Sequence, residues 1–198
     1  MLIDIDLLIS YGAVIDETPS IETIFEEGET PKYYYQIVDG RVKLNHVDED
    51  GKELIQSILT TGQSVCELLL FIDEKYPVNA VTLSETKLLR IPKINFFRLI
   101  NENPDISQDI NKFLSERLYQ KFIMMQNNAS LNPEVRLTGI LKYFKSFSND
   151  QSAFSFEVLL TRKQLASITG LRIETVIRTI KKMEAQNIVE IENRKIFY

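Results

Sequence analysis

The segment from Leu160 to Glu184 constrains the fold of this chain more than any other part of the sequence. Its pattern predicts two short helices joined by a tight turn, the arrangement known as a helix-turn-helix. Ala166 is small where the second helix would cross, Gly170 permits the left-handed backbone of a sharp turn, and Val176 is apolar where it would face the first helix. The alternative is an ordinary helical hairpin with solvated charges, and the basic outer face of the second helix argues against it.

That outer face carries the side chains of a predicted DNA-reading surface. The residues that fall toward the front of the helix, where base edges and phosphates would lie, are Arg172, Glu174, Thr175 and Arg178. The segment from Ile188 to Tyr198 then alternates like a β-hairpin. It would form the wing of a winged helix, with Arg194 and Lys195 available to phosphate.

The charge of the chain is divided unevenly along its length. The net charge is −5, but the residues from Thr161 onward include eight cations and four acids and so carry +4. The remainder of the chain therefore carries −9. A basic C-terminal part attached to an acidic body indicates that only the C-terminal part approaches phosphate.

The composition also argues against several kinds of site. One cysteine, Cys66, and one histidine, His46, provide no disulfide framework, no metal cluster of several Cys or His ligands, and no Ser-His-Asp or Cys-His catalytic arrangement. No run approaches the roughly 18 apolar residues of a membrane span, and the residues from Met1 to Asp6 carry acids where a secretory signal would be basic. We therefore expect a cytoplasmic protein with no metal site, no catalytic residues and no membrane partner.

Short β-rich stretches punctuated by glycine run from about Glu22 to Pro92 and predict a β-sandwich or jelly-roll barrel. The run from Tyr33 to Leu44 has the pattern strand, turn, strand around Asp39-Gly40, a dipeptide favoured in tight hairpins, so we expect a hairpin there. Three further strands are expected at residues 53–59, 80–83 and 87–91.

Helical periodicity follows the β-rich region. A short helix is expected from Lys93 to Ile100 and a long one at 105–127, whose apolar stripe must be buried. The stripe would pack on its own barrel or on the same helix of a second subunit. We favour the homodimer because two-fold symmetry suits a helix-turn-helix protein that reads two half-sites. A further helix is expected from Pro133 to Phe147, and a short strand from Phe154 to Leu159.

The order and spacing of these segments resemble the Crp/Fnr family of bacterial transcription regulators, from about Ile15 to Tyr198. The pieces that resemble the cyclic-nucleotide-binding barrel are Ile24–Gly28, Tyr35–Lys43, Asp50–Glu53 and Gly62–Phe71, and those that resemble the DNA-binding domain are Pro133–Leu137, Thr161-Arg162 and Glu174–Arg178. The resemblance implies an α+β fold, double-stranded DNA and RNA polymerase as partners, and a homodimer joined by the 105–127 helix. The expected domains are a β jelly-roll effector-sensing domain at 1–104, a dimerisation helix and hinge at 105–131, and a winged helix-turn-helix DNA-binding domain at 132–198.

The resemblance also assigns roles within the reader. Glu174 and Arg178 match the family's base-contacting pair, in which the carboxylate accepts from cytosine and the guanidinium binds guanine through two hydrogen bonds. Many relatives carry an arginine where this chain has Ile173, so the preferred half-site is expected to differ. Arg172 either compensates or contacts only phosphate. The full set of residues expected to contact DNA is Thr161, Arg162, Arg172, Ile173, Glu174, Thr175, Arg178 and Lys181.

The chain departs from the family in the nucleotide-binding cassette. In the family, a Gly-Glu pair and a later arginine hold the ribose hydroxyl and the cyclic phosphate. Here Cys66-Glu67 keeps only the glutamate, and the arginine position falls on Tyr76 or Pro77. Lys75 is the nearby cation, but its ammonium lacks the planar set of donors with which an arginine binds a phosphate through two hydrogen bonds. Losing that contact to a largely buried phosphate costs about 2–5 kcal/mol, so a cAMP response is not expected.

The expected effector pocket comprises Cys66, Glu67, Leu68, Lys75, Tyr76, Pro77, Lys121 and Phe122. Cys66 is either a redox sensor or an inert side chain in the glycine's place, and we favour the inert role. Phe122 either closes the pocket or belongs to the dimer core, which we favour, and we take His46 as a surface residue rather than a haem ligand. The pocket is either reshaped for another small molecule or vestigial, so no cofactor is assigned. The alternative function is a ligand-sensing module that acts through protein–protein contacts.

Overall fold

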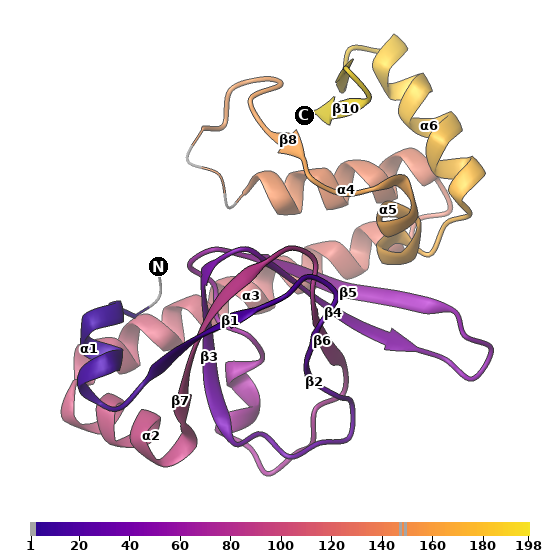
Figure 1. Cartoon of the computed structure of the whole chain (residues 1–198). Helices are drawn as coiled ribbons and strands as arrows, with labels where there is room; N and C mark the ends of the chain where they lie inside the picture. The colour runs from indigo at the N-terminus through magenta and orange to yellow at the C-terminus, as the bar shows by residue number, and fades with distance from the viewer. Residues whose placement is uncertain (1–2, 147, 149) are drawn as a thin grey trace. The chain divides into compact units, whose positions relative to one another are not determined.

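The computed structural model describes residues 3–146, 148 and 150–198. The chain forms two compact units, Met1–Glu116 and Arg117–Tyr198, and the division falls inside the long helix α3 (Pro104–Asn128) (Figure 1). Met1 and Leu2 of the acidic N-terminal segment, and Phe147 at the expected end of a helix, lie outside the described residues. The expected three-domain division by role stays a prediction.

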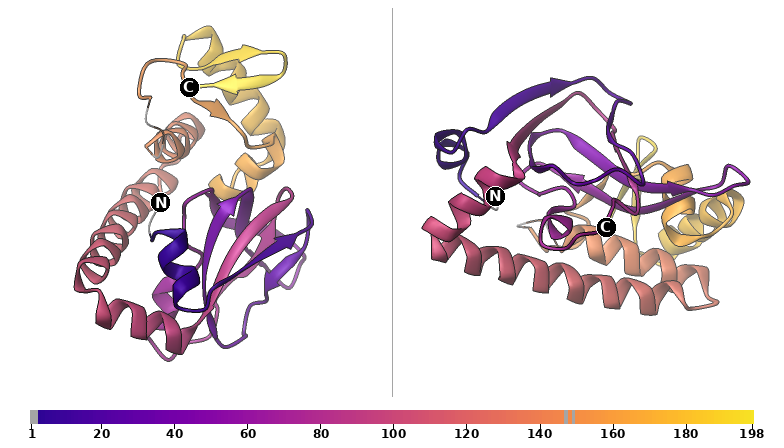
Figure 2. Two further views of the ribbon diagram at one scale, coloured as in Figure 1. Left: turned by 60° about the vertical axis from the view of Figure 1, so that its left-hand side comes forward. Right: turned by 90° about the horizontal axis from the view of Figure 1, so that it is seen from below.

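The first unit is the β-barrel expected from the sequence (Figure 2). One antiparallel sheet has the order β1-β7-β3 and the other the order β2-β6-β4-β5. The strands are β1 (Val14–Thr18), β2 (Thr23–Phe25), β3 (Tyr33–Asp39), β4 (Arg41–Val47), β5 (Glu53–Thr60), β6 (Asn79–Thr82) and β7 (Thr86–Pro92). Alternate side chains from both sheets fill the interior, among them Ile37, Val42 and Leu59.

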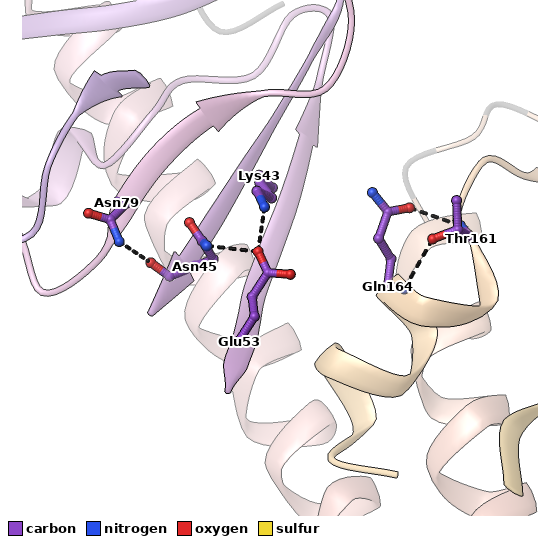
Figure 3. A network of polar contacts seen from close by, with 6 residues as sticks. All are labelled: Lys43, Asn45, Glu53, Asn79, Thr161 and Gln164. Atoms are coloured by element: carbon purple, nitrogen blue, oxygen red, sulfur yellow. Dashed lines mark hydrogen bonds and ion pairs between the residues drawn. The ribbon is translucent and has the colours of Figure 1, made fainter. Parts of the chain in front are cut away.

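Polar side chains join β4 to both of its neighbours (Figure 3). Lys43 and Asn45 on β4 both donate to Oε1 of Glu53 on β5, the second at 2.8 Å. The Asn79 side chain on β6 donates to the carbonyl oxygen of Asn45 at 3.3 Å. These bonds supplement the backbone ladder and fix the three strands in register.

The prediction of a hairpin at Asp39-Gly40 is wrong. The chain does turn there, with Gly40 at a φ of 106°, but β3 pairs with β7 while β4 pairs with β5 and β6. The turn is therefore a corner at which the chain passes from one sheet to the other. The turn requires glycine for two reasons. Its positive φ is one that glycine adopts easily, and a Cβ at position 40 would lie 2.5 Å from Oγ1 of Thr86.

Helices cover the outer side of the barrel and form a second apolar core. This core joins α1 (Ile5–Ser10), α2 (Lys93–Glu102) and the start of α3, and the Tyr34 and Phe96 rings stack in it with centroids 4.6 Å apart. Neither α1 nor β1 was predicted from the sequence. The Asp4 carboxylate caps α1 by accepting the Leu7 N–H at 3.0 Å, a short signal for a short helix.

The second unit is a winged helix-turn-helix. Its elements after α3 are α4 (Pro133–Lys145), β8 (Glu157–Val158), α5 (Arg162–Thr169), α6 (Ile173–Ala185), β9 (Glu190–Glu192) and β10 (Lys195–Phe197), with the sheet order β8-β10-β9. The strand expected over 154–159 is shorter than predicted. Phe154 has a φ of 59°, which is incompatible with an extended backbone.

Candidate DNA-reading surface and effector cassette

The turn between α5 and α6 has the geometry that its sequence predicts. Gly170 is left-handed, with φ 66° and ψ 21°, and the Leu171 N–H donates to the Ala166 carbonyl at 3.1 Å. Ala166 and Val176 are both buried in the seam between the helices. A Cβ at Gly170 would meet only Nη1 of Arg136, at 3.9 Å, so glycine is needed for its backbone conformation rather than for space.

Arg136 on α4 has a role that was not predicted from the sequence. Its guanidinium donates to the Thr169 carbonyl at 3.2 Å and to the Ser130 carbonyl at 2.5 Å. Carbonyls at the C-terminal end of a helix lack partners within the helix, so this cation completes the end of α5. Arg136 lies in the Pro133–Leu137 segment, which resembles the family's DNA-binding domain, but its sequence does not indicate which carbonyls it would bind.

Thr161 begins α5 through a capping box (Figure 3). Its hydroxyl accepts the Gln164 N–H at 3.1 Å, and the Gln164 side chain accepts the Thr161 N–H at 2.8 Å. These two bonds satisfy donors that the first turn of a helix leaves open. The Thr161 hydroxyl keeps its own proton for donation, so its expected contact with DNA is compatible with the cap.

Helix α6 separates its buried and exposed faces cleanly. The buried face carries Val176, Thr179, Ile180 and Met183. The exposed face carries Arg172, Ile173, Glu174, Arg178 and Lys181, with Thr175 half-buried beside them. No hydrogen bond or ion pair joins the charged groups of Arg172, Glu174, Arg178 or Lys181 to another described side chain. Their donors and acceptors are therefore open to a partner.

The wing lies beside the start of α5. Nη1 of Arg162 donates to the Arg194 carbonyl at 3.0 Å, and the hairpin turns through Asn193 and Arg194 with φ values of 48° and 68°. Lys195, expected to be available to phosphate, is paired with Glu157 at 2.9 Å. A surface ion pair of this kind contributes about 0–1 kcal/mol, so it hardly competes with a phosphate.

Cys66 in the cassette holds a backbone conformation that glycine adopts most easily. Cys66 precedes a short 3-10 helix, η1 (Glu67–Leu70), and is left-handed with φ 53° and ψ 31°. A family glycine would adopt that conformation without strain. Cys66 and Glu67 are buried, whereas Leu68 is exposed.

Tyr76, one of the two positions on which the family's arginine was expected to fall, fills part of the barrel interior. Its side chain is 4% exposed, and its ring stacks on Phe25 with centroids 3.6 Å apart. The Phe25 ring centroid lies in turn 6.0 Å from that of Tyr35. Burial raises the pKa of the Tyr76 hydroxyl above its usual range. Lys75 and Pro77 on either side are exposed. Position 76 thus contributes an uncharged ring to the core.

Lys121 and Phe122 belong to the second unit, on the later part of α3. Lys121 is half-buried and Phe122 is 54% exposed. Leu118, at 56%, and Met125, at 65%, share the face of Phe122 at helical spacing. Among the described residues no helix is long and apolar enough to cross a membrane.

Comparison with known proteins gave matches along nearly the whole chain. Residues 17–103 match the cyclic nucleotide-binding domain, and residues 135–197 match the Crp-like helix-turn-helix domain. The chain is 31% identical over 186 residues to the cAMP-activated global transcriptional regulator CRP of Salmonella typhimurium, covering 92% of this chain and 88% of that protein.

Solved structures share the fold. The c-di-GMP responsive global regulator CLP of Xanthomonas campestris has a TM-score of 0.76 at 21% identity, over 98% of this chain and 96% of that one. FixK2 of Bradyrhizobium japonicum has a TM-score of 0.78 at 17% identity, over 93% and 91%. At these identities the likeness concerns the architecture of barrel, long helix and winged helix.

Proposed function

Since the chain belongs to the Crp/Fnr family of transcription regulators, which are not enzymes, we propose that it binds specific DNA sites as a homodimer and does not respond to cAMP. The observation that carries the proposal is the open face of α6. Arg178 and Glu174 lie there with no partner among the described residues, on a helix held from behind by a buried apolar face. In the major groove, Arg178 would bind guanine and Glu174 would accept from cytosine.

The exposed face of α3 supports the dimer. Leu118, Phe122 and Met125 recur at intervals of four and three residues and are each more than half exposed. The same helix of a second copy would bury this stripe, as in a two-stranded coiled coil. The pair of α6 helices would then read two half-sites about 34 Å apart, one turn of DNA.

The cassette supports the absence of a cAMP response. The family's arginine would meet the cyclic phosphate with a charge-assisted pair of hydrogen bonds. Tyr76 carries no charge and its ring is packed on Phe25, while Lys75 is exposed. The Salmonella relative is named as cAMP-activated, so this chain combines a related fold with a changed cassette.

Selection from a randomised duplex library, with and without cAMP, tests both parts of the proposal. We expect an enriched two-fold symmetric motif that is the same in both conditions. A motif that appears only with cAMP would overturn the cassette argument and indicate that Lys75 or backbone amides replace the arginine.

No enrichment in either condition would count against the DNA-reading function and favour a module acting through protein contacts. In that case the Arg178→Glu variant would keep the protein–protein interactions of the unmodified chain. A regulator that binds DNA acts where the chromosome lies, so we propose the cytoplasm as its location and RNA polymerase as a further partner.

A further inference from the structure

Two apolar side chains lie on the exposed side of α6, among the charged groups proposed to read DNA. Ile173 is 40% exposed and Ile177 is 43% exposed. The other exposed side chains of this fully described helix are charged, apart from Ala185. A single exposed apolar residue is common on a protein surface, but two neighbouring ones on a binding face indicate a contact with apolar atoms of the partner.

Helical spacing places the two isoleucines side by side. They are four residues apart, so their Cβ atoms lie about 5–6 Å from each other on the helix surface. Ile177 also has Glu174 three residues before it and Lys181 four residues after it, and both of these neighbours are exposed. The apolar pair is therefore continuous with the groups proposed to contact base edges and phosphates.

The isoleucine pair lies at the border between the exposed and the buried face of α6, in the first two turns of the helix. Each isoleucine is followed three residues later by a buried residue, Val176 and Ile180. In helix-turn-helix proteins the N-terminal residues of the second helix contact base edges in the major groove. The position of the pair within the helix therefore places it at the bases rather than outside the groove.

The chemistry of the major groove offers one apolar group to such a pair. The cations Arg172, Arg178 and Lys181 beside the isoleucines match a phosphate-bearing partner. Base edges in the groove present nitrogen and oxygen donors and acceptors, and thymine adds its C5-methyl group. An isoleucine placed against a donor or acceptor would remove water from it without replacing the hydrogen bond, which is unfavourable. Thymine is therefore the base that fits the pair.

We propose that Ile173 and Ile177 read thymine through its C5-methyl group, beside the guanine and cytosine assigned to Arg178 and Glu174. The separation of about 5–6 Å between the two Cβ atoms exceeds the rise of about 3.4 Å per base step, so the pair reaches two neighbouring base pairs. Each half-site then contains thymine at one or both of these positions. The inference rests on the proposed function and adds a further base to the half-site.

Uracil tests this contact because it differs from thymine only in lacking the methyl group. The thymines of the selected site are replaced by uracil one at a time, and fluorescence anisotropy gives the affinity of the full-length chain for each duplex. We expect a loss of about three- to fourfold for each contacted methyl group, which is the effect of leaving one buried methyl-sized group out of the interface. The loss should occur at one position or at two neighbouring positions of the half-site.

Alanine variants assign the effect to the isoleucines. Ile177→Ala and Ile173→Ala shorten the side chain while alanine preserves the helix. We expect each variant to bind the uracil and thymine duplexes equally at the position that its isoleucine contacts. Ile94→Ala is the matched control, because it removes an isoleucine that is 78% exposed on α2, and it should keep the full effect of uracil.

Two results would overturn the inference. One is a selected site at which uracil weakens binding at no position. The other is a preference for thymine that persists in both Ile173→Ala and Ile177→Ala, because the methyl group would then act through the shape of the DNA or another side chain. Both results leave binding that depends on Arg178 in place. Failure to select any site would instead overturn the proposed function, and this inference with it.

Discussion

At the scale of single residues, Tyr76 fills part of the barrel interior with an uncharged aromatic ring. Its ring stacks on Phe25, and its hydroxyl makes no hydrogen bond with a described residue. We therefore expect Tyr76→Phe to change the free energy of unfolding by less than about 1 kcal/mol. Tyr76→Ala leaves a cavity where the ring was and should destabilise the barrel by about 3–5 kcal/mol. Urea unfolding followed by circular dichroism measures both, and equal effects of the two variants would contradict the packing role.

Two cations on α6 are expected to act differently on DNA. Arg178→Ala should cost about 1–3 kcal/mol at the selected site and relax the preference at one base pair, because a guanidinium reads guanine. Lys181→Ala should weaken binding to all sequences alike and lower the salt slope by about 1, as expected for a phosphate contact. Fluorescence anisotropy on the selected site, on base-substituted sites and at several salt concentrations distinguishes them. A uniform loss in Arg178→Ala would remove its base-reading role.

At the scale of elements, the α5–α6 turn depends on a backbone conformation. Because a Cβ at Gly170 has space, Gly170→Ala should be destabilising only through its left-handed φ, by about 1–2 kcal/mol. Gly170→Asn is the matched variant and should cost less, since asparagine tolerates this region better. Both values follow from urea unfolding. Alanine no worse than asparagine would mean that the turn relaxes and that its geometry is not fixed by the backbone.

Individual elements differ in how well they could be predicted from the sequence. The two helices of the helix-turn-helix and most barrel strands were predicted because each depends on local signals, such as Gly170 for the turn. Sheet assignment was not predictable in this way. Asp39-Gly40 carries the same local signal for a hairpin and for a corner, and only pairing with β7, distant in sequence, decides between them.

The site residues could likewise be predicted only where their environment depends on local sequence. The exposure of Arg178 was predictable from helical spacing. The burial of Tyr76, in the loop before β6, depends on a ring contributed by Phe25 of β2, which is distant in sequence. The hydrogen bond from Lys145 to Tyr198 was not predicted for a similar reason, because the two residues meet only in the folded unit. Contacts between distant segments leave no periodic pattern in the sequence.

At the scale of the whole molecule, the exposed stripe on α3 and the open face of α6 require each other in the proposed function. One copy of α6 offers a short reading surface, whereas two copies linked as a dimer gain about 10²- to 10⁴-fold in affinity by avidity. Breaking the dimer should therefore cost more DNA affinity than removing any one base contact. The affinity for the palindromic site should fall by more than the affinity for a single half-site.

Phe122→Glu places a charge in the middle of that stripe and should convert the dimer to a monomer, because the carboxylate would be buried without a partner. Gln120→Glu adds the same charge two residues before Phe122, on a different face of α3, and should leave the dimer intact. Sedimentation equilibrium gives the mass of each, and anisotropy gives its affinity for the palindromic site. If Phe122→Glu sediments as a dimer, the α3 stripe is not the interface. If it sediments as a monomer with unchanged affinity, the two reading helices do not act together.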